Sequence, residues 1–487
     1  MSEENAVPTH VRSPSCGDKV MTKRVNRKMD IALLPFLSLL YLFNGLDRSN
    51  VGNAETQGFT TDIGATSDDL NFAVSVFFIT FVLLQPPSAA IGRWLGAKHW
   101  ITIIMVGWGI FTLAHAFIHG RSALIAVRLM IGVFEAGFYP TTITYLSTFY
   151  SRYDLGVRIG LFYGQYAVAG AFSASIAFGI FHLNETRLKN WQYLFIIEGG
   201  LTILVALVAW FWLPRGPGSA WFLNSDEQKF VVRRIRKDNI SYVTHEYGTD
   251  GVERDRLTKR DIVETAKDWK LFFLLIFNIC ASVPSQAFSV FMPMVVQGLG
   301  YSSIQANLMS VPPFICGAIG LYLFALSSDY RKERGYHIIV GIFISLIGLI
   351  ITVTTLSHGA QYAGLCILLF GSYISAPLTL AWLSGNNPEP GKRSVVVGVN
   401  GFGNFAGVIG SQLYKKRYAP RYLTPFYATL GFVVAALVGY IAYKFILKAV
   451  NAKKLQMASG KTAEQAEAER LDGTRYADAK WTFLYGL

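Results

Sequence analysis

Apolar runs of about twenty residues recur along this chain, and short polar segments separate them. A helix of about 20 residues crosses the ~30 Å hydrocarbon core of a bilayer. The pattern predicts an all-α polytopic membrane protein rather than a soluble enzyme. The predicted spans are 30–53, 71–92, 101–119, 122–150, 157–182, 192–213, 271–298, 305–327, 337–357, 361–384, 395–414 and 424–448.

A long polar segment divides the twelve predicted spans into two groups of six. It opens with the helix-ending stretch LPRGPG and continues with SDEQ, which suits a helix start. The last segment has weak helical character and no core-forming pattern, so we expect it to be flexible or to lie on the surface. The predicted domains are an N-terminal tail (1–29), a six-helix half (30–213), a central loop (214–270), a second six-helix half (271–450) and a C-terminal tail (451–487).

Charge sets the expected orientation. The chain is 52% hydrophobic and 15% charged, with a net charge of +13. Of its 44 lysines and arginines, seven fall in the loops of one side, Arg48 and Arg128 fall in spans, and the rest lie on the other side. By the positive-inside rule this places both termini and the central loop in the cytoplasm, facing anionic lipids rather than nucleic acid. The basic loop KKRYAPRY, 415–422, is the one discordant segment.

The cysteines and the N-terminus add no further site. The four cysteines show neither metal-ligand spacing nor a disulfide framework. The first 29 residues contain no apolar segment followed by a small-residue cleavage site, so we expect no cleaved signal peptide.

Several motifs carry a family resemblance. They are LDRSNVGNA, RLMIGVFEAGFYP, WQYLFIIEGG, WFLNSDEQKFVVRR, GYSSIQANLMSVPP and GNFAGVIGSQLYKKRYAPRY, with FLYGL at the C-terminus. In this order and topology they resemble the fungal anion:cation symporter branch of the major facilitator superfamily, which includes allantoate, nicotinate and pantothenate permeases. The resemblance covers about residues 30–450, and spans 7 and 8 are most similar to the nicotinate permease subgroup.

The resemblance implies a function. Such proteins are not enzymes, carry no cofactor and couple uptake of a small organic anion to the proton gradient by alternating access. It implies a plasma-membrane protein that works as a monomer, with the anion, protons and the lipid bilayer as its partners. An exporter of a small metabolite and a non-transporting nutrient receptor remain as alternatives.

One loop departs from the superfamily pattern. The loop after span 2, GRWLGAKHW, lacks the usual acidic residue, whereas SSDYRKERGYH after span 8 keeps Asp329 with Arg331 and Arg334. A gate-latching role is therefore expected for the second loop rather than the first.

Two adjacent charges lie in the first span. An arginine within a membrane helix costs about 2.5–3.5 kcal/mol unless a partner or a wet cavity compensates it. The fork of Arg48 matches a carboxylate, and its surroundings resemble those of sialin-like relatives, where an arginine serves anion transport. The alternatives are an interhelix salt bridge and a side chain that snorkels to the outer surface, since Arg48 lies late in the span. Asp47 points about 100° away and is a candidate for proton coupling or for a structural anchor.

Three more charged residues lie within predicted spans. Glu135, in the middle of span 4, is the candidate proton carrier, and its alternative is a buried carboxyl held for packing. Arg128 lies seven residues earlier, on nearly the same face. The resemblance to the superfamily implies a structural and proton-responsive role for it. Glu198 in span 6 is expected to cap or pack.

Polar and aromatic residues of other spans are candidates for the substrate pocket, where a flat aromatic acid could stack on the rings. The alternative for each is helix–helix packing. The set consists of Tyr139, Asn278, Gln286 and Phe288 (near an expected break at Pro284), Tyr373, Trp382, Asn400 and Asn404.

Two short patterns complete the set. Asn184 begins a glycosylation sequon in a short predicted outside loop. The glycine-rich stretch GVNGFGNFAG, 398–407, lies inside an apolar span without a preceding strand, so it indicates close helix packing rather than a nucleotide loop.

Overall fold

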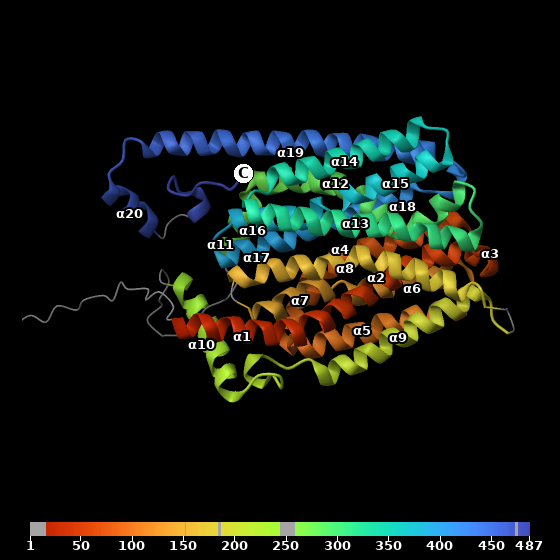
Figure 1. Ribbon diagram of the computed structural model, residues 1–487, viewed down its shortest axis with the longest axis horizontal. Helices are drawn as coiled ribbons and strands as arrows, with labels where there is room; N and C mark the ends of the chain where they lie inside the picture. The colour runs from red at the N-terminus through yellow and green to blue at the C-terminus, as the bar shows by residue number, and fades with distance from the viewer. Residues whose placement is uncertain (1–15, 151, 184–186, 244–258, 473–475) are drawn as a thin grey trace, which may run out of the picture.

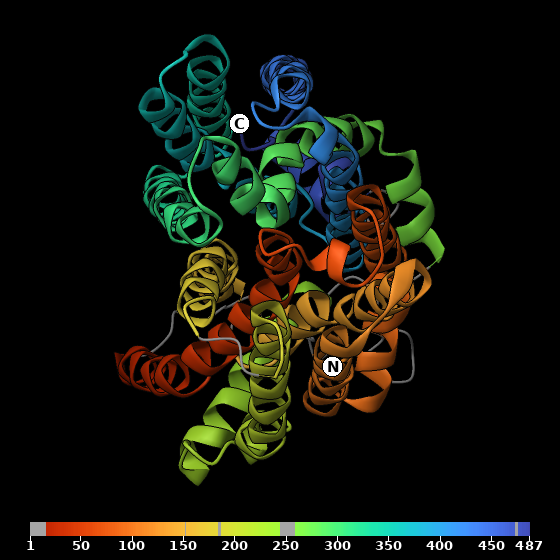
Figure 2. The same cartoon turned by 90° about the vertical axis from the view of Figure 1, so that its right-hand side faces the viewer.

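Two bundles of long helices lie side by side in the computed structural model, which describes residues 16–150, 152–183, 187–243, 259–472 and 476–487. Viewed along the bundle, the first half (red to yellow) lies below and the second half (green to blue) above (Figure 2). Among the described residues, eleven helical stretches are long and apolar enough to cross a membrane. The helix α8 takes the place of the predicted fifth span. The twelve-span fold class is confirmed.

The first half begins earlier than predicted, because residues from Cys16 onward already form a helix. Its helices are α1 (Cys16–Ala32), α2 (Leu34–Glu55), α3 (Phe59–Asp62), α4 (Ser67–Leu95), α5 (Ala97–Ala114), α6 (Gly120–Glu135), α7 (Phe138–Ser147), α8 (Arg152–Ile180) and α9 (Asn190–Trp212). The central loop contributes α10 (Ser225–Val243) and α11 (Lys259–Lys267).

The second half continues beyond the predicted last span, because its final long helix extends to Ala458. Its helices are α12 (Trp269–Gly298), α13 (Ser303–Arg331), α14 (Gly335–Thr354), α15 (His358–Ser372), α16 (Ser375–Asn386), α17 (Pro390–Asn400), α18 (Ala406–Leu413), α19 (Leu423–Ala458) and α20 (Ala463–Leu471). The described residues also include five short 3₁₀ segments, of which Gly401–Phe405 links α17 to α18.

One predicted span breaks at a closely packed glycine, whereas another continues through its prolines. Span 4 is divided between α6 and α7, at Ala136 and Gly137, just before Pro140. A Cβ atom on Gly137 would lie 1.9 Å from Oγ of Ser88, so the close approach requires glycine. In contrast, α12 runs unbroken through Pro284 and Pro293, so the break expected in span 7 is absent.

The two ends of the bundle differ. We call the end that carries α1, α10, α11 and α20 the termini end, and the end that carries α3 the opposite end (Figure 1). The halves meet where α2 packs on α12, α4 on α18 and α8 on α13. The approach of α2 to α12 is the tightest, because a Cβ atom on Gly52 would lie 1.7 Å from the carbonyl oxygen of Val290.

Polar side chains close the opposite end across the two halves. Nδ2 of Asn71 donates to the carbonyl oxygens of Ser411 and Tyr414. Nδ2 of Asn307 donates to Oγ1 of Thr56 at 3.0 Å. These bonds join the first and second spans of one half to spans 8 and 11 of the other, so the structure is closed at the end away from the termini.

We predict that Gly52→Ala loosens this closure. The added methyl group forces α2 away from α12, and overpacking of this kind costs about 1–3 kcal/mol. Thermal unfolding of the detergent-purified protein, followed by tryptophan fluorescence, should show a lower transition temperature. Gly431→Ala on α19 is the matched control, since nothing lies within 4 Å of its added Cβ. Equal transitions for the two variants would contradict the packing argument.

Candidate functional site

A buried ion pair joins the first and fourth spans. Nη2 of Arg48 on α2 lies 2.9 Å from Oε2 of Glu135, the last residue of α6. The side chains are 5% and 0% exposed. The two residues predicted separately as anion hook and proton carrier are therefore partners in this structure, and the carboxylate compensates the cost of burying a guanidinium.

Aromatic rings surround the guanidinium. Its carbon lies 4.6 Å from the ring centre of Phe81, 5.2 Å from that of Phe77 and 5.5 Å from that of Tyr166. Such ring faces attract a cation and exclude water. Nε of Arg48 has no hydrogen-bond partner among the described residues. The guanidinium therefore keeps a donor that a second carboxylate can use.

Asp47 lies on a different side of α2. Its Oδ2 accepts hydrogen bonds from Nε1 of Trp108 on α5 and from Oγ1 of Thr202 on α9, both at 3.0 Å. This agrees with the 100° rotation between neighbouring helical residues. Asp47 thus faces the interior of the first half, while Arg48 faces α6 and α8.

The interior of the first half holds more acid than base. Glu198 is fully buried beside Asn50, and neither of its carboxyl oxygens has a hydrogen bond of good geometry within the described part of the chain. Arg128 is 1% exposed, and its Nε and Nη2 likewise lack partners there. With the Arg48–Glu135 pair and Asp47, these residues form a set of three carboxyl groups and two guanidinium groups among the described residues. Glu55 is also buried but lies apart from this set, with Thr60 and Lys416.

Amide side chains of the second half form two rungs between α12 and span 11. Nδ2 of Asn278 donates to Oδ1 of Asn400 at 3.1 Å, and Nε2 of Gln286 donates to Oδ1 of Asn404 at 3.0 Å. The hydroxyl group of Tyr166 on α8 donates to Oε1 of Gln286 at 3.3 Å. Four predicted pocket residues are thus brought together, and Tyr166 links them to the ring cluster around Arg48.

An aromatic cluster extends from Arg48 towards the termini end. The ring of Tyr139 lies 6.1 Å from that of Tyr41, which stacks on Phe162 at 4.5 Å. The ring of Tyr373 lies 6.2 Å from that of Tyr166. Sequence reasoning named Tyr139 and Tyr373 but missed the other three. Tyr41 was detectable, because it precedes Arg48 by seven residues and so shares its helix face.

Two predicted pocket residues lie apart from this cluster. Phe288 packs against Tyr414 and Phe426, with ring centres 5.1 and 6.1 Å away. Nε1 of Trp382 donates to the carbonyl oxygen of Gly486 at the termini end. The structure therefore places Phe288 in the packing of the second half and Trp382 against the C-terminal segment.

Comparison with known proteins decides the family. The family model described as Major Facilitator Superfamily matches residues 37–411. The chain belongs to the major facilitator superfamily. Its superfamily relatives include the high-affinity nicotinic acid transporter of Saccharomyces cerevisiae, which is 30% identical over 435 residues, 89% of this chain and 79% of the relative. The major facilitator-type transporter hxnP of Emericella nidulans is 33% identical over 420 residues, 85% and 83% of the two chains.

Solved superfamily structures have the same fold. A bacterial homolog of the human lysosomal transporter Spinster, in its inward-facing and unoccupied conformation, has a TM-score of 0.64 and 16% identity. The match covers 88% of this chain and 98% of that one. The xylose transporter XylE from E. coli has a TM-score of 0.61 and 13% identity, covering 84% and 96%. The chain is a membrane transporter of this superfamily.

The residues predicted to latch a gate in the superfamily loop lie around the end of α13. Asp329 forms an ion pair with Arg334, whose Nη1 also donates to Oγ of Ser328 at 3.0 Å. Arg331, in the last turn of α13, is exposed. These contacts stay within one half, so the gating role remains a prediction. The sequon residue Asn184 lies outside the described residues.

We predict that replacing Glu135 destabilises the folded protein more than replacing Arg48 does. Glu135→Gln leaves guanidinium groups that cannot lose their protons, and an unpaired buried charge costs about 3–5 kcal/mol. Arg48→Met leaves a carboxyl group that can become neutral by taking up a proton. Thermal unfolding of detergent-purified variants should therefore show a larger loss for Glu135→Gln.

The double variant Arg48→Met/Glu135→Leu should recover most of that loss, since no charge of the pair remains. Arg121→Met is the control, because Arg121 forms an exposed pair with Asp69 and such pairs contribute about 0–1 kcal/mol. Additive losses in the double variant would mean that the two side chains do not stabilise each other.

Proposed function

We propose that this transporter carries a small organic anion into the cell together with protons. The proposed substrate is a monocarboxylate such as nicotinate, or a related vitamin acid or ureide. The proposed setting is the plasma membrane, with both termini cytoplasmic and with the proton gradient as the only energy source. The observation that carries this proposal is the buried pair of Arg48 and Glu135.

The pair supports coupling because one guanidinium serves two competing carboxylates. While Glu135 is ionised, it occupies Arg48 at 2.9 Å. A proton on Glu135 removes that negative charge, and Arg48 then needs another anion to compensate its burial. A substrate carboxylate meets this need with two parallel hydrogen bonds. Protonation and anion binding thereby favour each other, which is the thermodynamic requirement for symport.

The excess of buried acid in the first half also supports proton binding. Asp47, Glu135 and Glu198 outnumber Arg48 and Arg128 by one negative charge. An uncompensated charge in so apolar an interior is costly, and a carboxyl group becomes neutral by taking up a proton. The proposal therefore includes at least one proton held within the first half while the central pair is closed.

The tyrosine cluster favours a flat substrate. The ring of Tyr166 lies beside Arg48, and the ring of Tyr41 lies 6.3 Å from that of Tyr166 and 6.1 Å from that of Tyr139. An aromatic acid would stack its ring there while its carboxylate reaches the guanidinium. A relative named as a nicotinic acid transporter, at 30% identity, supports the same substrate class.

The first test changes the anion partner. Arg48→Lys keeps the charge but loses the planar fork, so uptake should fall at least about tenfold, and Arg48→Ala should abolish it. The measurement is uptake of radiolabelled nicotinate, and of other vitamin acids, ureides and amino acids, by a transporter-deficient host. Arg121→Ala is the control, and surface abundance is measured for every variant. Normal uptake by Arg48→Ala would overturn the assignment.

The second test separates proton coupling from substrate binding. Glu135→Gln should lose net uptake driven by an inward proton gradient, because the amide cannot take and release a proton. Exchange of labelled for unlabelled substrate should persist, since exchange needs no net proton movement. Both are measured in vesicles with an imposed pH difference, which also gives the direction of transport. Gradient-driven accumulation by Glu135→Gln would exclude Glu135 as the coupling residue.

A further inference from the structure

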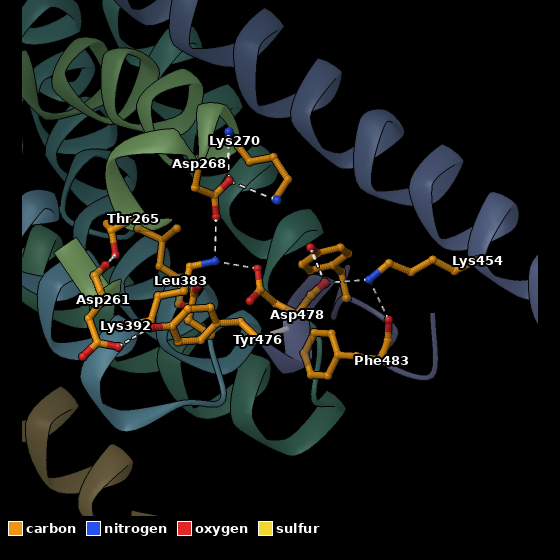
Figure 3. A network of polar contacts seen from close by, with 12 residues as sticks. Asp261, Thr265, Asp268, Lys270, Leu383, Lys392, Lys454, Tyr476, Asp478 and Phe483 are labelled. Carbon is orange, nitrogen blue, oxygen red and sulfur yellow. Dashed lines mark hydrogen bonds and ion pairs between the residues drawn. The ribbon is translucent and has the colours of Figure 1, made fainter. Parts of the chain in front are cut away.

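The last residues of the chain take part in a network of polar contacts at the termini end of the second half (Figure 3). We call residues 476–487 the C-terminal segment. Asp478 is 3% exposed, and Tyr485 is 6% exposed. The sequence led us to expect a flexible or surface-lying tail, and the structure places the segment on the second half with Asp478, Lys480 and Tyr485 buried and Leu484 exposed. Such a segment needs specific contacts that compensate the entropy of ordering it.

Two asparagines recognise the backbone of this segment. Oδ1 of Asn386 accepts from the amide nitrogen of Gly486 at 2.8 Å, and its Nδ2 donates to the carbonyl oxygen of the same residue at 3.2 Å. Asn451 pairs with Tyr485 in the same way, at 2.9 and 2.8 Å. Nε1 of Trp382 also donates to the carbonyl oxygen of Gly486, at 2.7 Å. Each asparagine thus satisfies both backbone groups of one peptide residue, as a neighbouring strand would.

A basic pocket holds the tyrosine side chain. The ring centre of Tyr485 lies 4.3 Å from Nζ of Lys454 and 5.3 Å from Nζ of Lys270. Its hydroxyl group donates to the carbonyl oxygen of Asp478 at 2.7 Å. Nζ of Lys454 donates to the carbonyl oxygens of Asp478 and Phe483, at 2.7 and 3.0 Å. Cation–π contact and hydrogen bonding therefore select an aromatic hydroxyl at this position.

Ion pairs fasten the start of the segment. Nζ of Lys392, at the beginning of α17, lies 2.6 Å from Oδ2 of Asp478 and 3.2 Å from Oδ2 of Asp268. Burial alone would raise the pKa of Asp268, but Lys270 and Lys392 hold it below its usual range. The hydroxyl group of Tyr476 donates to Oδ1 of Asp261 on α11 at 2.6 Å.

The site is assembled from helix ends that are far apart in the sequence. Its members come from α11, the start of α12, the end of α16, the start of α17 and the cytoplasm-directed part of α19 in the proposed topology. Four of these helices belong to different spans of the same half. A peptide that contacts all of them ties their ends together.

We infer that the termini end of the second half is a peptide-binding site, and that its ligand is the extended C-terminal segment of the same chain. Recognition rests on backbone pairing by Asn386 and Asn451 and on the pocket for Tyr485. This inference concerns the packing of the second half and does not depend on the identity of the transported substrate.

Digestion of protein expressed as residues 1–487, whose chain ends at Leu487, tests the inference. Carboxypeptidase Y needs a free, extended C-terminus, so a docked segment should resist loss of Leu487. Asn386→Ala/Asn451→Ala should lose Leu487 at least about tenfold faster, because protection follows the population of the undocked state. Mass spectrometry of detergent-purified protein measures the rate. Gln456→Ala, an exposed amide on α19, should behave as wild type. Equal rates for wild type and double variant would overturn the inference.

Binding of a peptide in trans provides an independent readout. The variant Tyr485→Ala retains the pocket but weakens its own segment. A fluorescent peptide with the sequence of residues 481–487, WTFLYGL, should bind this variant at least about tenfold more tightly than wild type, whose site is occupied. A scrambled peptide should not bind. Equal binding to both proteins, or to neither, would overturn the inference.

Repeating the carboxypeptidase digestion at several protein concentrations tests whether the bound segment comes from the same chain. Protection by a segment of the same chain is independent of protein concentration. Loss of protection on dilution would assign the bound segment to a second copy of the chain and would overturn the assignment to the same chain.

Discussion

The cost of holding guanidinium groups in an apolar bundle dominates the first half of this transporter. Arg48 is tolerated because Glu135 reaches it from α6 and because aromatic rings enclose it. The carboxylate is in position because span 4 breaks directly after it, where Gly137 allows close packing on Ser88. A local backbone feature thus supports the ion pair, and the ion pair fixes the first span against the fourth.

The two halves solve the problem of buried polarity differently. The first half concentrates ionisable groups, since Asp47, Glu135 and Glu198 lie buried with Arg48 and Arg128. In the second half, neutral amides form the rungs between α12 and span 11. Tyr166 is the described residue that joins the two systems, with its ring beside Arg48 and its hydroxyl group on Gln286. Tyr166 is therefore the contact through which a change of charge at Arg48 would act on Gln286.

The termini end shows how a segment outside the membrane spans becomes structural. Eight of the twelve residues of the C-terminal segment are apolar or aromatic, but the segment is too short to cross a bilayer. Its order depends on partners at Asn386, Lys392 and Asn451, at least 34 residues away in each case. Backbone pairing and charge compensation hold it there, and neither leaves a periodic signal in the segment itself.

The sequence by itself determined the number of spans, the division into two halves and the family, because hydrocarbon thickness dictates the length of apolar runs. It also singled out Arg48, Glu135 and the amides of spans 7 and 11, because polar groups are costly in a membrane wherever they lie. Only the tertiary structure decided that Arg48 pairs with Glu135, that Trp382 binds the C-terminal segment and that α12 continues through Pro284. The physical reason is that a span's sequence shows which groups need a partner, whereas the packing of helices distant in the chain decides which partner comes within reach.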